Sequence, residues 1–533
     1  MPRTVGVRDP AGATAEMWPA PSRRLGRGSA LAVGGAAFLL LVAGSWVPAW
    51  SGDEAATVMV ARRPLDQVLQ TAGSDPALLP YYLLANLWAM SSTSEWWLRL
   101  PSVLAMVAAV TVTSVLASRM GGRRRLGLLA AAMMLALPAV SRYGQDARPY
   151  AFSVLVVGAL VLLWYPGLST WSRRVVFVGL VAVLALLQPY ALLILPVLVL
   201  TSLVAPSGDR RREVMTTGLS AAAGIVLAVP HLLLVADRAV GQPDPPPVTV
   251  ANVAEELLRL PVGMLSPLLA APAAAMMLAL PVIGVFVGWR RGDRRQAVLL
   301  AAWVALPPLA LSGLQLLGWG PGLVARYWTL CLPAIAIGAA VTIEALWLRN
   351  RTAAIATSLL VVVLTLPSHL ALRAVDGHLG QGWRELPRVL AHPTLRDAPL
   401  LVEGWTYRAL LSNEPALHDR MVLIVDPAPE GRVNPRTHGP DSPAFARLVE
   451  RGGPVVVLQT EPGFAAALPA RRAFRDFRTE LRAFPILAVR CTYFGDPLGV
   501  FLASDTVLTA EEAEELAEHI SGVAPARIRC AAG

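Results

Sequence analysis

The 533-residue sequence contains no lysine, so all 46 of its cationic side chains are arginines. Charged residues make up only 15% of the chain, hydrophobic residues make up 55%, and the mean hydropathy is +0.54. Soluble globular proteins carry about 25% charged residues, so the composition excludes an ordinary water-soluble protein and indicates extensive contact with lipid. The net charge of +10 predicts no nucleic-acid partner, because the arginines cluster in short loops between apolar runs.

Cysteine is almost as rare, with Cys331 in an apolar run and Cys491 and Cys530 in the polar tail. No Cys-x-x-Cys or His-x-x-x-His spacing occurs, so we predict neither a metal ion nor a bound cofactor. The sequence also lacks a glycine-rich loop for nucleotide phosphates. We therefore expect the substrate to be a lipid-linked donor and not a nucleotide.

Apolar runs long enough to cross a bilayer recur between Leu31 and about Leu372. The positive-inside rule places the arginine-rich loops between them in the cytoplasm. These loops are 119–125, 173–174, 210–212, 290–295 and 349–351. The pattern predicts a polytopic α-helical protein of the cell membrane with about eleven transmembrane helices. The first span is expected at 30–50, with the amino terminus inside and the carboxyl terminus outside.

These assignments divide the chain into a cytoplasmic tail (1–29), a transmembrane domain (30–372) with a first external loop at 51–99, and a further domain (373–533). The run at 78–90 within that loop is expected to be an interfacial helix. Beyond residue 372, short β-rich runs at 421–425, 454–458 and 486–489 alternate with helical stretches. This alternation predicts an extracytoplasmic α/β domain.

Two local features of that domain are testable. Thr509 and Glu512 have the spacing of a capping box that begins an acidic helix. Outside the cytoplasm, Cys491 and Cys530 can form a disulfide or remain as two free thiols, and both alternatives stay open.

Polar motifs recur at the predicted external ends of the spans. In order, they are Ser51-Gly52-Asp53-Glu54, Leu79-Pro80-Tyr81-Tyr82, the segment 94–102, Tyr143-Gly144-Gln145-Asp146-Ala147-Arg148-Pro149-Tyr150, and Arg326-Tyr327. Their order and spacing resemble the GT-C glycosyltransferases that use polyprenyl-phosphate sugars. The resemblance is to the bacterial protein O-mannosyltransferases, the aminoarabinose transferases and their actinobacterial relatives. It covers roughly residues 30–350 and is strongest over 45–155.

The resemblance implies that Asp53 is the catalytic base and that Glu54 assists it. A carboxylate within hydrogen-bond reach can take the proton of an acceptor hydroxyl as that hydroxyl attacks the anomeric carbon. Arginine suits the departing phosphate, because its planar fork binds phosphate oxygens and stays charged. Arg148 is the first candidate for binding the donor phosphate, followed by Arg142 and Arg326. The alternative for each arginine is an interfacial side chain that snorkels to water.

Four tyrosines, Tyr81, Tyr82, Tyr143 and Tyr150, are candidate contacts for the sugar or its phosphate. An aromatic belt at the membrane interface is the alternative explanation. Relatives carry a histidine shortly before the Pro-x-Tyr element, whereas this sequence has Asp75 in that stretch. The resemblance therefore does not carry over a substrate contact there.

The predicted function is inverting transfer of a hexose, preferably mannose, from a polyprenyl-phosphate sugar to an extracytoplasmic glycan, glycolipid or protein. A lipid-linked sugar flippase or transporter is the alternative, although ionisable residues deep in the spans are almost absent. A catalytically degenerate partner in envelope assembly is the third hypothesis.

Overall fold

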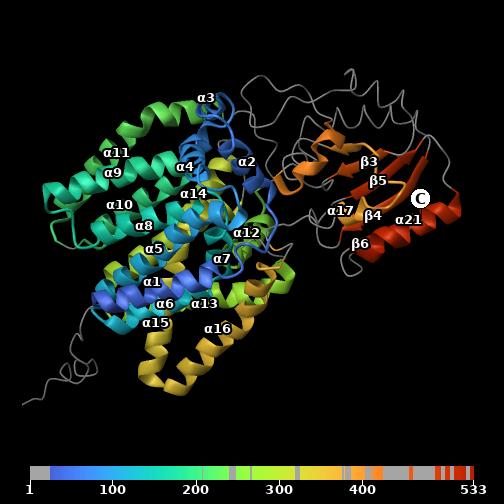
Figure 1. Cartoon of the computed structure of the whole chain (residues 1–533). Coiled ribbons are helices and arrows are strands. Elements are labelled where there is room, and N and C mark those ends of the chain that lie inside the picture. The colour runs from blue at the N-terminus through green and yellow to red at the C-terminus, as the bar shows by residue number, and fades with distance from the viewer. Residues whose placement is uncertain are drawn as a thin grey trace, which may run out of the picture.

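The computed structural model of the protein describes residues 25–206, 208–238, 248–263, 267–318, 324–374, 377, 386–402, 410, 412–423, 455–459, 486–493, 499–504, 509–523 and 528–532. Most of the predicted cytoplasmic tail, residues 1–24, lies outside the described residues. Figure 1 shows a bundle of helices built from the first two thirds of the chain, beside a smaller part that contains a β-sheet.

The bundle combines α-helices with short 3₁₀-helices. Its elements are α1 (Arg27–Val42), α2 (Gly52–Ala61), α3 (Leu65–Gln70), η2 (Thr71–Gly73), η3 (Pro76–Leu78), α4 (Leu79–Ala89), α5 (Glu95–Gly121), α6 (Arg124–Ala136), α7 (Pro138–Gly144), α8 (Tyr150–Trp164), α9 (Trp171–Leu187), η4 (Pro189–Leu193), α10 (Ile194–Val204), α11 (Arg210–Arg238), α12 (Val250–Val262), α13 (Pro267–Arg290), α14 (Arg294–Leu316), η6 (Ala325–Cys331), α15 (Leu332–Arg349) and α16 (Arg351–Ala371).

Within the described residues, six helices are long and apolar enough to cross a membrane: α5, α11, α13, α14, α15 together with η6, and α16. The pair α6 and α7 adds a seventh if the two helices, bent by 71° where they meet, form one span. Shorter apolar helices are α1, α8 and the stretch 189–204. The chain is therefore a multi-pass membrane protein, and the number of about eleven spans stays a prediction.

The first apolar run forms a shorter helix than its hydropathy predicts. Helix α1 ends at Val42 instead of continuing to residue 50, and Gly44 then takes a left-handed conformation with φ +76°. Backbone carbonyl groups freed by this break still find donors, because Gln145 Nε2 lies 2.7 Å from Leu41 O and Arg99 donates to three carbonyl groups of segment 45–49. A break in the helix is tolerated at membrane depth only where such donors replace the helical hydrogen bonds.

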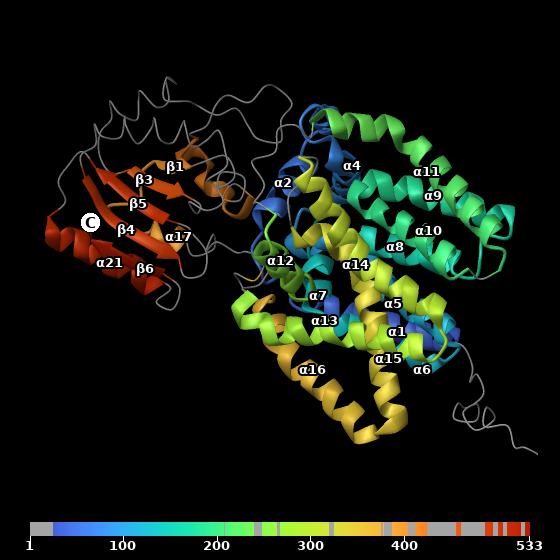
Figure 2. The ribbon, with the colours of Figure 1, turned by 180° about the vertical axis from the view of Figure 1, so that it is seen from behind.

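Helix α15 lies at the centre of the bundle. In the 18-residue apolar stretch that includes α15, 94% of the residues are buried. In the corresponding stretches of α11 and α16 only 22% are buried, and apolar side chains are exposed. Gly284 of α13 approaches α15 so closely that an added Cβ atom would lie 2.1 Å from Gly338 O. Small residues allow this backbone-to-backbone packing between membrane helices. Figure 2 shows α12, α13 and α14 on the side of the bundle opposite to that seen in Figure 1.

The two ends of α15 carry different groups. At one end, Arg123 Nη1 lies 3.9 Å from Glu344 Oε2 and the Arg125 guanidinium lies 3.9 Å from the Trp347 ring centroid. At the other end, η6 carries Arg326. The 18 residues of α15 span about 27 Å at 1.5 Å per residue, close to the thickness of a bilayer core. Arg326 and the arginine-rich loops therefore lie at opposite ends of the bundle.

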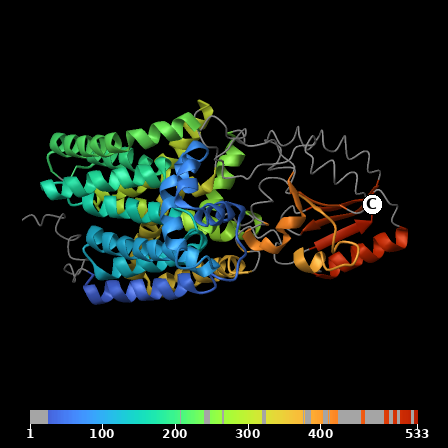
Figure 3. The same ribbon diagram turned by 45° about the horizontal axis from the view of Figure 1, so that its top comes forward.

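The carboxyl-terminal part (386–532) contains a β-sheet, which Figure 3 shows to one side of the helical bundle. The sheet is mixed and six-stranded, in the order β2-β1-β3-β5-β4-β6. Its elements are α17 (Leu386–Val389), β1 (Leu400–Val402), η7 (Pro415–Arg420), β2 (Met421–Leu423), β3 (Val455–Gln459), β4 (Ile486–Tyr493), β5 (Gly499–Ser504), α21 (Ala510–Val523) and β6 (Ile528–Ala532). Strand β1 pairs in parallel with β2 and β3, and the remaining pairs are antiparallel.

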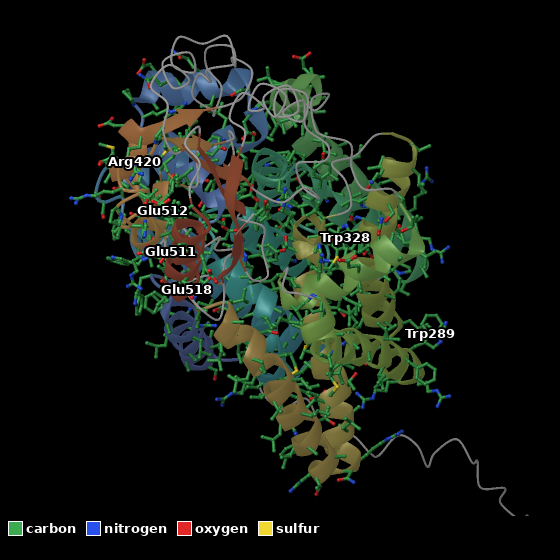
Figure 4. The ribbon with its side chains drawn as sticks, turned by 90° about the vertical axis from the view of Figure 1, so that its right-hand side faces the viewer. Trp289, Trp328, Arg420, Glu511, Glu512 and Glu518 are labelled. Carbon is green, nitrogen blue, oxygen red and sulfur yellow. The ribbon has the colours of Figure 1, made fainter. Side chains whose placement is uncertain are left out.

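Helix α21 contacts β4 and β6. The capping box expected at its start is confirmed, since Thr509 N lies 2.8 Å from Glu512 Oε2 and Glu512 N lies 3.2 Å from Thr509 Oγ1. Figure 4 shows Glu511, Glu512 and Glu518 along this helix. The beginning of α21 thus follows from two residues at the expected spacing.

The register of β4 and β6 places Cys491 directly opposite Cys530. Cβ atoms of directly opposed residues in an antiparallel pair lie about 4.5–5.5 Å apart, close to the separation in a disulfide. We predict that these two cysteines form a disulfide when the carboxyl-terminal part is outside the cytoplasm. Denatured, unreduced protein should then react with maleimide at Cys331 alone, and reduction should release two further thiols. Labelling of all three cysteines without reduction would contradict the prediction.

Candidate active site

Asp53 lies in the first turn of α2, where the local sequence fixes the direction of the helix. Ser51 Oγ accepts a hydrogen bond from Glu54 N at 3.2 Å, and Glu54 Oε2 accepts one from Ser51 N at 3.0 Å. These reciprocal bonds form a capping box, which satisfies amide groups that the first helical turn leaves free. The Asp53 side chain remains 35% exposed at this helix start.

Glu54 points into the protein and is fully buried. Its Oε1 lies 2.7 Å from Arg99 Nε and its Oε2 lies 2.8 Å from Arg99 Nη2, so the pair is bidentate. Arg99 also donates to the carbonyl groups of 45, 48 and 49, and its Cζ lies 4.8 Å from the Trp50 ring centroid. The sequence prediction that Glu54 assists Asp53 fits this geometry poorly, because both carboxylate oxygens are already engaged.

The Glu54–Arg99 pair also connects two loops. Glu54 Oε1 accepts a hydrogen bond from Ala147 N at 3.1 Å, and Ala147 precedes Arg148 in the chain. The carboxylate next to Asp53 therefore holds the start of α2 against the segment between α7 and α8. This connection keeps Asp53 and Arg148 close together.

Asp53 meets two of the three predicted phosphate-binding arginines. Asp53 Oδ1 lies 3.3 Å from Arg148 Nη2, and Asp53 Oδ2 lies 2.5 Å from Arg326 Nη1. Burial alone would lower the pKa of Arg148, but Asp53 beside it raises that pKa overall, so the guanidinium stays charged. In the described part of the chain, Arg148 Nε, Arg148 Nη1 and Arg326 Nε are buried donors without a hydrogen-bond partner.

Arg142 forms a separate ion pair. Its Nη1 lies 3.3 Å from Asp146 Oδ2, and both side chains are buried. Burial raises the pKa of Asp146 to about 6, although Arg142 acts in the opposite direction. Gly263 ends α12 at φ +75° and packs on this pair, since an added Cβ atom would lie 2.8 Å from Arg142 Cβ. Sequence analysis did not single out Asp146 as a partner for Arg142.

Tyr81 and Tyr82 are buried, and their hydroxyl groups are engaged within the protein. Tyr82 Oη donates to Asp75 Oδ2 at 2.8 Å, and Tyr81 Oη lies 3.4 Å from Ser102 Oγ. Ser102 Oγ in turn donates to Arg148 O at 3.1 Å. These contacts favour a structural role for both tyrosines over direct contact with a sugar.

Tyr143 and Tyr150 pack edge to face, with ring centroids 5.4 Å apart. A second aromatic pair lies beside Arg326, where the rings of Tyr190 and Tyr327 are 5.1 Å apart. The Arg326 Cζ atom lies 5.5 Å from the Tyr327 centroid. In the sequence, Tyr190 follows Gln188 and Pro189 at a break between two apolar runs. This pattern does not indicate a functional site.

Helix α12 supports the segment that carries Arg326. Glu256 Oε2 accepts a hydrogen bond from Ala325 N at 2.6 Å, and Glu256 Oε1 accepts one from Arg259 Nη1 at 2.9 Å. Burial raises the pKa of Glu256, while these two hydrogen bonds oppose the shift. Sequence analysis did not predict this helix.

No known family model matches the chain, and no curated protein matches its sequence. Solved structures do match its fold. ArnT from Cupriavidus metallidurans bound to undecaprenyl phosphate has a TM-score of 0.56 at 13% identity, covering 90% of this chain and 98% of that one. The apo state of the same ArnT has a TM-score of 0.54 at 14% identity, covering 89% and 98%.

The Archaeoglobus fulgidus oligosaccharyltransferase tethered with an acceptor peptide is less similar, with a TM-score of 0.47 at 12% identity and coverage of 90% and 74%. The ArnT match extends over the helical bundle and beyond it. The chain therefore has the GT-C fold, the fold of ArnT, over nine tenths of its length.

Proposed function

We propose that the protein is a membrane glycosyltransferase that moves a sugar from a polyprenyl-phosphate donor to an acceptor hydroxyl outside the cytoplasm. The cluster of Asp53, Arg148 and Arg326 carries this proposal, because it joins a proton acceptor to two phosphate-binding cations at 3.3 and 2.5 Å. ArnT, whose fold the chain shares, was crystallised with undecaprenyl phosphate. That complex supports a lipid phosphate as the donor's leaving group.

In the proposed reaction, the acceptor oxygen attacks the anomeric carbon and the bond from that carbon to the phosphate oxygen breaks. The acceptor proton passes to Asp53, which lies between two guanidinium groups. The polyprenyl phosphate leaves with the bonding electron pair. A single displacement of this kind inverts the anomeric configuration.

The two arginines can contact Asp53 and phosphate at the same time. Each one touches Asp53 through a single terminal nitrogen, and the donors without partners, Arg148 Nε, Arg148 Nη1 and Arg326 Nε, belong to the same guanidinium groups. Preorganised cations of this kind stabilise the charge that develops on a leaving phosphate. The leaving group already carries negative charge, so the proposal invokes no cofactor or metal.

The position of the arginine-rich loops supports one orientation in the membrane. They lie at the end of the bundle opposite to Arg326, and the positive-inside rule assigns them to the cytoplasm. We therefore propose that Asp53 and residues 373–533 face the outside. Within this proposal the donor sugar is a hexose, preferably mannose, and the acceptor is a glycan, glycolipid or protein.

Truncation of either phosphate-binding arginine tests the proposal. Arg148→Ala and Arg326→Ala should each lower kcat/KM for transfer from polyprenyl-phosphate mannose by at least about 10²-fold, the effect of losing one preorganised donor. Arg148→Lys should recover only part of the loss, because an ammonium group lacks the planar fork. The assay uses proteoliposomes, radiolabelled donor and an envelope acceptor, with folded protein quantified.

Arg396→Ala is the matched control, because Arg396 is exposed in the carboxyl-terminal part. This variant should transfer sugar at the wild-type rate. Wild-type transfer from Arg148→Ala at normal protein levels would contradict the assignment. Movement of the labelled lipid across the bilayer without any transfer would favour the flippase alternative.

A further inference from the structure

The carboxyl-terminal part makes direct polar contact with the segment that leads into α2. Asn413 Oδ1 accepts a hydrogen bond from Trp50 N at 2.9 Å, and Asn413 Nδ2 donates to Trp50 O at 3.2 Å. Ser412 Oγ adds a hydrogen bond to Ala55 O at 3.3 Å. Two adjacent side chains thus bind the main chain on both sides of Asp53, across 363 residues of sequence.

Apolar packing accompanies these hydrogen bonds. Ala49 and Ala55 belong to a buried cluster whose other members all come from the carboxyl-terminal part, including Leu390, Leu400 and Leu410. Ala49 and Ala55 are therefore part of the hydrophobic core of the carboxyl-terminal part, whereas Trp50 packs with Leu98 and Ala147 of the bundle. The rest of α2 packs on α4 inside the bundle.

The paired hydrogen bonds fix the orientation of the two peptide units on either side of the Trp50 Cα atom. The Asn413 amide satisfies both main-chain polar groups of Trp50, as a neighbouring β-strand would. The main chain at Trp50 therefore has little rotational freedom. Trp50 is followed by Ser51, the cap of α2, and its ring lies 4.8 Å from Arg99 Cζ. A shift at Trp50 therefore reaches both the capping box and the Glu54–Arg99 pair.

We propose that Asn413 is a positioning residue that acts through Trp50 and sets the distance of Asp53 from Arg148 and Arg326. The kinetic consequence rests on the proposed function, whereas the contact itself does not. A misplacement of about 1 Å at a reacting group can cost about 10²-fold in rate. The carboxyl-terminal part thus completes a site whose reacting groups lie in the bundle.

Asn413→Ala should lower kcat by about 10- to 100-fold, with a smaller change in KM for the lipid-linked donor. KM is expected to change less because Arg326 keeps its own support, the Ala325 main chain bound by Glu256. Steady-state transfer in proteoliposomes, normalised to folded protein, gives both constants. An unchanged kcat would overturn the proposal.

Two control variants separate positioning from stability. Asn350→Ala makes the same truncation at the start of α16, where Asn350 Oδ1 accepts from Ala353 N at 3.0 Å, and should leave kcat unchanged. Arg420→Ala removes hydrogen bonds to Leu395 O and Ala398 O inside the carboxyl-terminal part, so it should lower the melting temperature while folded protein keeps its kcat. If Arg420→Ala lowers kcat as far as Asn413→Ala does, Asn413 acts only through stability and the proposal fails.

Hydrogen exchange provides a readout that does not depend on activity. In Asn413→Ala, the peptide that covers residues 44–58 should exchange faster than in the wild type, because Trp50 N loses its acceptor. The same peptide should be unchanged in Asn350→Ala. Unchanged exchange in Asn413→Ala would overturn the positioning contact, whereas faster exchange in a protein without transferase activity would overturn the proposed function alone.

Discussion

Asp53→Asn is expected to lower kcat for sugar transfer by about 10²- to 10⁴-fold, the range that a general base contributes. The amide has the same shape as the carboxylate but cannot take the acceptor proton. It also carries no charge, so Arg148 and Arg326 become more available to phosphate. The donor KM should therefore stay constant or fall, and single-turnover transfer in proteoliposomes measures both effects.

The matched control is Asp66→Asn, which removes an exposed carboxylate from α3 in the same segment between α1 and α5. This variant should transfer sugar at the wild-type rate. If Asp53→Asn retains wild-type kcat while folded protein is present at normal levels, Asp53 is not the base. A raised donor KM with unchanged kcat would instead assign Asp53 to donor binding.

Glu54→Gln is expected to destabilise the protein by about 3–5 kcal/mol, because it leaves the buried Arg99 charge without its partner. The matched control is Glu255→Gln, which removes a carboxylate from an ion pair with Arg259 whose side chains are 45% and 31% exposed. That change should cost no more than about 1 kcal/mol. Denaturant unfolding in detergent micelles compares the two variants.

A double variant tests the cause of this instability. Glu54→Gln combined with Arg99→Met removes both buried charges, and replacing a buried ion pair with apolar groups is often close to neutral. We therefore expect the double variant to be more stable than Glu54→Gln alone. Equal or greater instability in the double variant would show that the hydrogen bonds of Arg99 to segment 45–49 matter more than the charge balance.

The sequence contained enough information to predict the helix start at Gly52. Ser51 and Glu54 have the same spacing as Thr509 and Glu512, whose capping box was recognised from the sequence. Applied at Ser51, the same rule predicts that Glu54 turns back to the main chain, away from Asp53 and the acceptor. The prediction that Glu54 assists Asp53 came from the family resemblance and did not consider this capping box.

Of the three arginines predicted to bind phosphate, Arg148 and Arg326 lie against Asp53, whereas Arg142 pairs with Asp146. Polar contacts between residues far apart in the chain could not be predicted from the sequence. The end of α1 at Val42 depends on donors from Arg99 and Gln145, and hydropathy alone extends the apolar run to residue 50. The docking of Asn413 on Trp50 has no local signal either, because an asparagine in a polar tail is ordinarily a turn residue.

The Asn413–Trp50 contact also bears on how the protein is made. The ribosome completes Trp50 363 residues before it reaches Asn413, a delay of tens of seconds at about 5–20 residues per second. During that interval the segment around Trp50 lacks its hydrogen-bond partner Asn413. We therefore expect maturation to depend on docking of the carboxyl-terminal part, and we expect a chain truncated before Asn413 to carry Asp53 without the contact that orients Trp50.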